Sequence, residues 1–189
     1  MSLPTTRLGL KGVEPLIVDD NAQSLEVVTA ILMGFGINKA VKCQSVAEAR
    51  DMLLCRVFDL VIVDCEMPDE DGHDLLRYIR SDPQGPNFTV PVLMMSAVTP
   101  RSKVEAARDD GANFTIAKPV SPITLLERML WIAQSSRMFI SDPGYCGPDR
   151  RFRTVPLQDG VSERRNADLI LTSKPERALS QDEIDGLFT

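Results

Sequence analysis

The stretch LVIVDCEMPDEDG, residues 60–72, decides the fold because it joins a short apolar run to an acidic turn and to the start of a helix. Four consecutive aliphatic residues, 60–63, are typical of a strand that is buried on both faces of a parallel sheet. Asp64 follows that run and begins the polar turn. From Gly72 onward the apolar residues recur with helical spacing, so the stretch has the pattern of one βα unit.

The same alternation extends in both directions, from Pro15 to about Ser135. We expect strands at Pro15–Val18, Ala40–Cys43, Leu60–Val63, Val92–Met95 and Phe114–Ala117. Apolar residues three or four apart predict helices at Ser24–Met33, Val46–Cys55, Gly72–Arg80, Ser102–Asp109 and Ile123–Ala133. Five such units predict an α/β fold, a five-stranded parallel doubly wound sheet with five helices on its two faces.

The composition excludes several classes of function. The 189 residues include 21 Lys and Arg against 27 Asp and Glu, and this acidic balance argues against a sequence-independent grip on nucleic acid. The four cysteines are irregularly spaced and, with a single histidine, form no zinc signature, so we expect reduced, mostly buried thiols. No apolar run is long enough to cross a bilayer and the start has no signal-peptide pattern, which predicts a cytoplasmic protein without membrane insertion.

Side chains of complementary chemistry fall where the predicted strands end. In a doubly wound sheet, ligands bind beyond the carboxyl ends of the strands, at the point where the winding reverses. Clustered carboxylates there suit Mg²⁺, one of them can act as a nucleophile, and a hydroxyl and an ammonium group can donate to phosphoryl oxygens. The set therefore predicts phosphoryl transfer to a carboxylate, and it consists of Asp19, Asp20, Asp64, Ser96 and Lys118.

Four segments, in this order and spacing, resemble the signature segments of response-regulator receiver domains of the chemotaxis CheY type: LIVDDN (16–21), LVIVDCEMPDEDG (60–72), VLMMSAV (92–98) and IAKPVSP (116–122). The resemblance spans residues 13–135 and implies the flavodoxin-like receiver fold of a two-component system. It also implies a phosphoprotein that takes its phosphoryl group from a histidine kinase or phosphotransfer protein. No enzyme activity is implied beyond self-catalysed phosphorylation and dephosphorylation.

The resemblance assigns roles residue by residue. The implied phosphoacceptor is Asp64, the implied Mg²⁺ ligands are Asp19, Asp20, Asp64 and the main-chain carbonyl of Glu66, and the implied phosphate sensors are Ser96 and Lys118.

The chain departs from the family pattern at one position that matters. Three residues before Lys118, where the family usually has an aromatic residue that couples phosphorylation to the output face, this chain has Thr115, with Phe114 just before it. Either Thr115 reports a movement of Ser96 in a reduced form of the switch, or Phe114 is a core strand residue. Cys65, beside the acceptor, also has two interpretations, a redox-sensitive thiol or a packed one.

After the predicted domain the sequence changes character. Glycines and prolines break up a polar stretch, which predicts an extended or disordered linker over residues 136–178. The stretch is too poor in apolar residues to form a second domain, and it lacks the pattern of a three-helix DNA-reading module, so we expect no direct DNA binding. Its segment GPDRRF, residues 147–152, has no role that the sequence defines.

Residues 179–189 predict a short amphipathic helix. The spacing of a serine and a glutamate matches a capping box, two aliphatic residues are placed for a hydrophobic staple, and two further apolar residues extend the same edge. A helix of about two turns is unstable alone in water, so such a segment is expected to dock on a surface. The predicted docking residues are Leu179, Ser180, Glu183, Ile184, Leu187 and Phe188.

The run LSQDEIDGLF, residues 179–188, resembles the N-terminal segment of the flagellar switch protein FliM. Phosphorylated CheY-type receivers bind that peptide on the face formed by their fourth helix, fifth strand and fifth helix. The resemblance predicts phosphorylation-dependent docking of the tail onto its own receiver domain, onto a second copy, or onto another chemotaxis receiver. A solvated terminus without a receptor is the alternative.

Two functions of different kind follow from the sequence. One is a signalling switch that acts by protein contact in chemotaxis or motility, with chemotaxis or flagellar switch proteins as partners. The other is a phosphate sink or phosphorelay intermediate, in which the reaction at Asp64 is itself the output.

Overall fold

The computed structural model describes residues 10–135, 138–142, 144–149 and 177–188. Its sheet contains five parallel strands in the order β2-β1-β3-β4-β5, so the prediction of a doubly wound α/β fold is confirmed. The strands are β1 (Pro15–Val18), β2 (Val41–Cys43), β3 (Leu60–Asp64), β4 (Val92–Ser96) and β5 (Phe114–Ala117).

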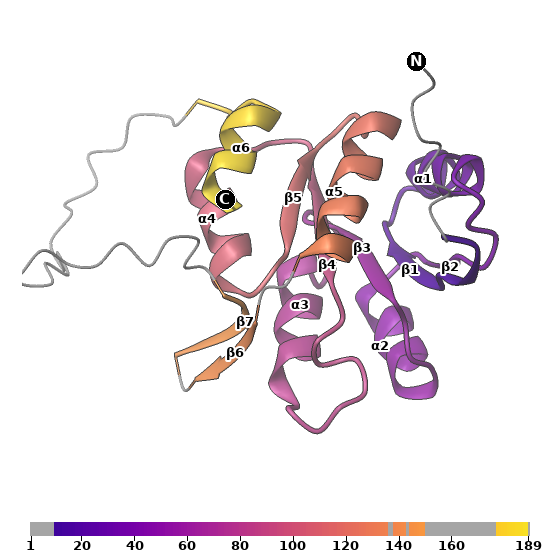
Figure 1. The fold of residues 1–189 in the computed structure, drawn as a ribbon, viewed down its shortest axis with the longest axis horizontal. Coiled ribbons are helices and arrows are strands. Elements are labelled where there is room, and N and C mark those ends of the chain that lie inside the picture. The colour runs from indigo at the N-terminus through magenta and orange to yellow at the C-terminus, as the bar shows by residue number, and fades with distance from the viewer. Residues whose placement is uncertain (1–9, 136–137, 143, 150–176, 189) are drawn as a thin grey trace, which may run out of the picture.

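The helices lie on both faces of this sheet (Figure 1). The chain moves outward from β1 to β2 and then back across β1 to β3, and right-handed crossovers therefore place the first helix on the face opposite to the next three. The helices are α1 (Ala22–Gly34), α2 (Val46–Cys55), α3 (Gly72–Ser81), α4 (Arg101–Asp109) and α5 (Pro122–Gln134), preceded by a short 3-10 turn, η1 (Leu10–Gly12).

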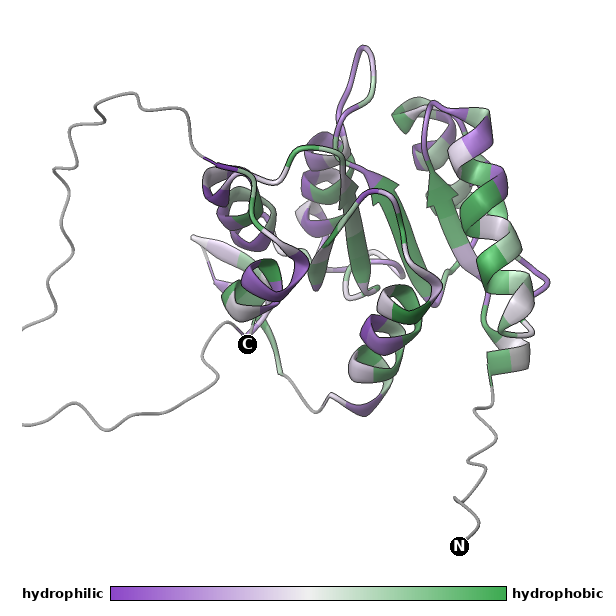
Figure 2. Cartoon of the chain, turned by 90° about the horizontal axis from the view of Figure 1, so that it is seen from above, coloured by the Kyte–Doolittle hydropathy of each residue, from purple (hydrophilic) through white to green (hydrophobic). Residues whose placement is uncertain are grey.

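The sheet forms the centre of the core, and the buried faces of the helices complete it. Every residue of β1, β3 and β4 is buried, which explains why these strands read as continuous apolar runs rather than as an alternating pattern. Figure 2 shows the central strands as the most uniformly hydrophobic part of the chain. Side chains at the carboxyl ends of such strands are therefore held on a rigid frame.

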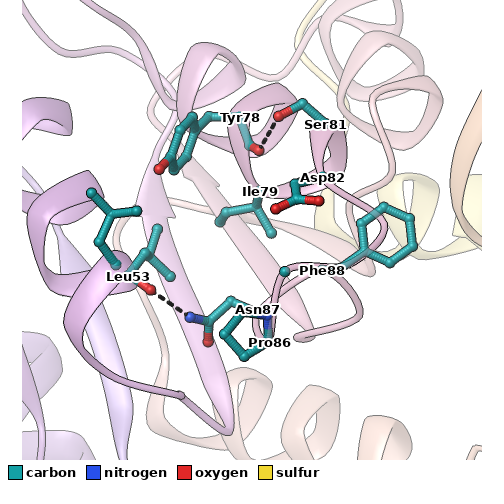
Figure 3. A pocket seen from close by; sticks show the side chains of 10 residues that line it. Leu53, Tyr78, Ile79, Ser81, Asp82, Pro86, Asn87 and Phe88 are labelled. Atoms are coloured by element: carbon teal, nitrogen blue, oxygen red, sulfur yellow. Dashed lines mark hydrogen bonds between the residues drawn. The ribbon is translucent and has the colours of Figure 1, made fainter.

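A buried amide fastens the loop between α3 and β4 to the end of α2 (Figure 3). The Asn87 side chain accepts a hydrogen bond from the Phe58 N–H at 2.9 Å and donates to the carbonyls of Leu53 at 2.9 Å and Arg56 at 2.7 Å. One side chain thus satisfies three backbone groups and fixes the floor of a surface pocket between α2, α3 and this loop.

A β-hairpin follows the receiver fold, so the prediction of an extended or disordered linker is wrong for the residues that form it. Strands β6 (Phe139–Asp142) and β7 (Tyr145–Pro148) pair antiparallel within residues that the sequence assigned to the linker. The hairpin packs by backbone contact: Gly111 has a φ of 97°, and a Cβ there would lie 2.1 Å from the Cys146 carbonyl oxygen. Such a contact needs glycine rather than large apolar residues, and the rest of the predicted linker, residues 150–176, lies outside the described residues.

An arginine lies beneath the hairpin. Arg80 is buried, and its guanidinium donates to the carbonyls of Phe88, Val90 and Gly111. The Phe139 ring covers it at 5.1 Å, and burial lowers the pKa of Arg80 to about 10. The hairpin therefore packs against the domain, because its Phe139 ring covers a desolvated cation.

The last described element is α6 (Gln181–Phe188), which lies beside α4 and β5 (Figure 1, yellow). The Ser180 N–H donates to the Glu183 carboxylate at 3.0 Å, and the Glu183 N–H donates to the Ser180 hydroxyl at 3.4 Å, which is the arrangement of a capping box. Within the described ranges, no helix is long and apolar enough to cross a membrane.

Candidate functional site

Three carboxylates meet where the winding of the sheet reverses. Asp64 ends β3, Asp19 and Asp20 follow β1, and β1 and β3 are neighbours in the sheet. One oxygen from each carboxylate lies within 4.8 Å of the others. The three predicted metal-ligand side chains are therefore brought together.

Lys118 reaches the three carboxylates from the end of β5, and these four side chains form one corner of the sheet's edge. Its Nζ lies 2.8 Å from Asp19 Oδ2 and 2.9 Å from Asp64 Oδ1. Burial on its own would lower the pKa of Lys118, but the hydrogen bonds to the two carboxylates outweigh it and raise that pKa. The ammonium group is therefore charged, as a partner for a phosphoryl oxygen must be.

The electrostatics of the corner favour a further cation. Burial raises the pKa of Asp64, and the charges of Asp19 and Asp20 raise it further, while Lys118 opposes both effects. Three carboxylates thus share this site with one ammonium group, which contacts Asp19 and Asp64. A hard divalent cation such as Mg²⁺, which takes oxygen ligands, fits this donor set.

Asp19 is the fixed member of the cluster. It has no solvent exposure, and its carboxylate accepts hydrogen bonds from the Asn21 N–H at 3.0 Å and from the Ser24 hydroxyl. Asn21 in turn caps α1 by accepting from the N–H groups of Gln23 and Ser24. Asp20 is exposed at the rim of the site, where a hydrated ion can approach it.

Gly72 sets the position of the acceptor's backbone. A Cβ at Gly72 would lie 2.2 Å from the Asp64 carbonyl oxygen, so only glycine lets α3 begin this close to the acceptor. Asp71 and Asp74 form a capping box at the same point, a feature that the sequence analysis missed because Asp is an uncommon partner in that motif.

The Ser96 hydroxyl is held within its own loop. Ser96 ends β4 and is buried, and its Oγ donates to the Val98 carbonyl at 2.7 Å and accepts from the Val98 N–H at 3.2 Å. The register pairs Ser96 with Ala117, two residues from Thr115, so the Ser96 and Thr115 side chains share one face of the sheet. Among the described residues, the buried Thr115 hydroxyl has no hydrogen-bond partner.

The two residues that follow the acceptor, Cys65 and Glu66, have different surroundings. The Glu66 carboxylate forms an exposed ion pair with Lys103 of α4, while the role of its main-chain carbonyl stays a prediction. Burial raises the pKa of the Cys65 thiol to about 12. A protonated, buried thiol agrees with the packed interpretation of Cys65 rather than the redox-sensitive one.

The predicted docking residues of the tail divide into two groups. Ile184 and Phe188 are buried and Leu179 and Leu187 are partly buried against the core, whereas Ser180 and Glu183 cap the helix. The interpretation of Phe114 as a core strand residue is confirmed, since it has no solvent exposure. Its ring lies 4.7 Å from that of Trp131 on α5 and 5.4 Å from that of Phe188 on α6.

The polar residues that fasten the tail were missed by the sequence analysis. They have no distinctive spacing, and their partners lie far away along the chain, so only the folded arrangement identifies them. These residues are Thr99, Arg108 and Arg128 on the receiver side and Gln181 and Asp185 on the tail.

Comparison with known proteins agrees with this geometry. Residues 16–130 match the family model of the response regulator receiver domain. The chain belongs to that family. The receiver domain is 34% identical over 119 residues to the chemotaxis protein CheY-3 of Vibrio cholerae, a match that covers 63% of this chain and 90% of that protein. It is 31% identical over 114 residues to CheY of Pseudomonas aeruginosa, covering 60% and 90%.

Solved structures share the fold of the receiver domain. A putative response regulator from Chloroflexus aurantiacus matches with a TM-score of 0.60 and 31% identity, over 65% of this chain and 98% of that one. The receiver domain of the histidine kinase CKI1 from Arabidopsis thaliana, complexed with Mg²⁺ and BeF₃⁻, matches with a TM-score of 0.58 over 67% and 95%. At 24% identity, this second likeness shows the fold alone.

The receiver domain therefore places this chain in a two-component system, and its relatives suggest chemotaxis as the setting. The family match ends at residue 130, so the β6–β7 hairpin and α6 lie beyond the matched region.

Proposed function

We propose that this protein is a phosphorylation switch that accepts a phosphoryl group on Asp64 from a histidine kinase or phosphotransfer protein and acts by protein contact. The observation that carries the proposal is the placement of Lys118, which bridges Asp19 and Asp64 beside the exposed Asp20. This arrangement supplies a nucleophile, a cation-binding pair and a fixed positive charge within one corner.

The transfer uses the groups at this corner. A carboxylate oxygen of Asp64 attacks the phosphorus of a phosphohistidine, the new P–O bond forms, and the P–N bond breaks with its electron pair passing to the imidazole nitrogen, which takes a proton from water. Lys118 pairs with one phosphoryl oxygen, and Ser96 donates to another after it leaves Val98. Hydrolysis follows when water attacks the phosphorus, breaks the bond to Asp64 and releases phosphate.

The implied metal would be held by Asp19, Asp20, Asp64 and the main-chain carbonyl of Glu66. When bound, Mg²⁺ neutralises the charge of the incoming phosphoryl group. Because Asp19 is already fixed by its hydrogen bonds, the exposed Asp20 is the ligand that adjusts to the ion.

Labelling with a phosphoryl donor tests the proposal. Full-length protein, incubated with Mg²⁺ and a labelled small-molecule donor such as acetyl phosphate, should become labelled, whereas Asp64→Asn and chelation of the metal should abolish the label. Asp69→Asn is the matched control, because it makes the same change in the same acidic loop at an exposed residue whose φ of 68° suits Asn. Normal labelling of Asp64→Asn would reject Asp64 as the acceptor.

The relatives and the tail support a chemotaxis or motility setting, with flagellar switch proteins among the candidate partners. Two relatives are named as chemotaxis proteins, and the tail sequence resembles the switch-protein segment. The expected cellular location is the cytoplasm, where such partners would be met.

A second candidate function, a phosphate sink, is favoured by one observation. The face formed by α4, β5 and α5 is covered by α6 in this structure, which leaves the reaction at Asp64 available as the output. Phosphoryl transfer from a cognate kinase, followed with and without a switch-protein peptide, separates the two functions. Rapid transfer and loss without any peptide binding would support the sink.

A further inference from the structure

The tail binds the open edge of the sheet. β5 is an edge strand, so among the described residues one side of its backbone has no neighbouring strand. The Gln181 side chain pairs with this edge: its amide nitrogen donates to the Thr115 carbonyl at 3.1 Å, and its amide oxygen accepts from the Ala117 N–H at 2.8 Å. A single glutamine thus meets one donor and one acceptor of the edge, as a paired strand would.

Apolar and charged contacts surround this pair. Ile184 and Phe188 of α6 are buried against the receiver domain. Arg128 of α5 forms a mostly buried ion pair with Asp185, and an Arg108 guanidinium nitrogen lies 3.5 Å from the Leu187 carbonyl in the last turn of α6. An acidic helix therefore lies against two arginines, and this charge complementarity identifies the chain's own tail as a fitting occupant of the face.

The residues before α6 form hydrogen bonds with the loop from Ser96 to Pro100, which carries the predicted phosphate sensor; these bonds are called the clasp. The Leu179 N–H donates to the Thr99 carbonyl at 2.6 Å, the buried Thr99 hydroxyl donates to the Leu179 carbonyl at 2.8 Å, and Ala178 bridges to Pro100. Thr99 is three residues from Ser96, whose hydroxyl is bonded in both directions to Val98. The tail and the Ser96 hydroxyl therefore hold the same short loop.

We infer that the C-terminal segment 177–188 is an intramolecular ligand of the α4–β5–α5 face, and that its docking opposes phosphorylation at Asp64 through the loop from Ser96 to Pro100. To donate to a phosphoryl group, Ser96 must release Val98, and the clasp at Thr99 stabilises the loop in which that release has not occurred. By reciprocity, phosphorylation weakens tail docking, which is the opposite of the dependence that the resemblance to FliM predicts. This inference rests on the proposed function, because it concerns the regulation of the same site.

The test compares the full chain with a docking-defective variant. Ile184→Asp places a charge in the apolar contact, Gln181→Ala removes the pairing with β5 as a milder variant, and Asp182→Asn on the exposed side of α6 is the control. Trp131, the only tryptophan of the sequence, contacts Phe114, which contacts Phe188, so its fluorescence reports docking.

The measured quantity is the affinity for beryllofluoride, a phosphoryl mimic, in the presence of Mg²⁺. Ile184→Asp should bind it more tightly by about fivefold or more, the lower end of typical coupling between two sites, with Gln181→Ala between this variant and the control. In the wild-type chain, beryllofluoride should shift the Trp131 emission toward that of Ile184→Asp. Equal or weaker binding by Ile184→Asp would overturn the inference.

A synthetic peptide of residues 177–189 tests occupancy of the face. It should bind full-length Ile184→Asp and be excluded from the wild-type chain. The difference in Trp131 emission between these chains should not change with protein concentration, whereas dilution-dependent docking would overturn the intramolecular assignment. If wild type and every variant fail to bind beryllofluoride with Mg²⁺, the proposed function itself fails; equal binding by all of them removes only the inference.

Discussion

At the scale of single residues, the pair of Lys118 with the fully buried Asp19 is the contact with the largest energetic consequence. Lys118→Ala leaves a buried carboxylate without its cation, and we expect a loss of about 3 kcal/mol in the free energy of unfolding. Urea unfolding in the presence of a chelator measures this loss. Saturating Mg²⁺ should reduce it, because a bound cation restores positive charge beside Asp19.

Lys103→Ala is the control for that experiment, since its ion pair with Glu66 is exposed and should contribute less than about 1 kcal/mol. Equal losses for the two lysine variants would show that the charge of Asp19 is compensated in another way.

The four thiols should differ in reactivity. Burial raises the pKa of Cys43 and Cys65 to about 12, so almost no thiolate forms there at pH 8, whereas Cys55 is exposed. Iodoacetamide labelling of the folded protein, read by peptide mass spectrometry, should modify Cys55 first and leave Cys43 and Cys65 unmodified until the chain unfolds. Early labelling of Cys65 would revive its interpretation as a reactive thiol.

Residue types at strand ends could be predicted, but their hydrogen bonds could not. Because parallel strands end at one edge, Asp64 and Lys118 had to lie near each other once the strands were assigned. The Ser96 hydroxyl donates to the Val98 carbonyl rather than pointing to the phosphorylation site, and this choice depends on the side-chain rotamer of Ser96. A rotamer of this kind depends on the local backbone and on neighbours distant in sequence, which no sequence pattern records.

At the scale of elements, the β6–β7 hairpin depends on a close approach of two backbones. Gly111→Ala should displace the hairpin, because the residue has a positive φ and the new Cβ would meet the Cys146 carbonyl. We expect a loss of about 2 kcal/mol or more. Chemical unfolding measures it, and Gly34→Ala is the control, since a Cβ there meets no atom of the described chain within 4 Å.

The tail helix can also be strengthened. Gly186 lies within α6 and is exposed, and a Cβ added there would meet no atom of the described residues within 4 Å, so Gly186→Ala should favour the helix by about 1 kcal/mol. The expected readouts are slower hydrogen exchange in residues 181–188 and weaker beryllofluoride binding by the full chain. Faster exchange would contradict the expected gain in helix stability, and slower exchange with unchanged beryllofluoride binding would indicate that docking does not depend on the helix.

The elements differ in how well their sequences announce them. A buried strand such as β3 has a continuous apolar run, and an amphipathic helix such as α2 has apolar residues three or four apart. Both elements were predicted within one residue of their observed bounds. The hairpin was missed because a contact between Gly111 and Gly147 leaves no apolar pattern to read. Local sequence predicts elements that bury side chains better than elements that pack by their backbones.

At the scale of the whole molecule, the folded domain extends beyond the family match. Of two chains that both lack α6, the one that ends at residue 135 should be about 2 kcal/mol less stable than the one that ends at residue 149, because Arg80 and Phe88 lose the cover of Phe139. Thermal and urea unfolding of the two truncated chains make the comparison. Equal stabilities would show that the hairpin contributes no net cover.

The docked helix α6 has a consequence for any outside ligand of the same face. A segment tethered to its own site competes at an effective concentration on the order of 1 mM, so a soluble competitor present at about 10 µM must bind about 100-fold more tightly than the tail to occupy half of the molecules. The tethered tail therefore sets a minimum affinity that an outside ligand must have to bind this face, and this minimum is the threshold for binding. Substitutions in α6, rather than in the face, would move that threshold without altering which chemistry the face accepts.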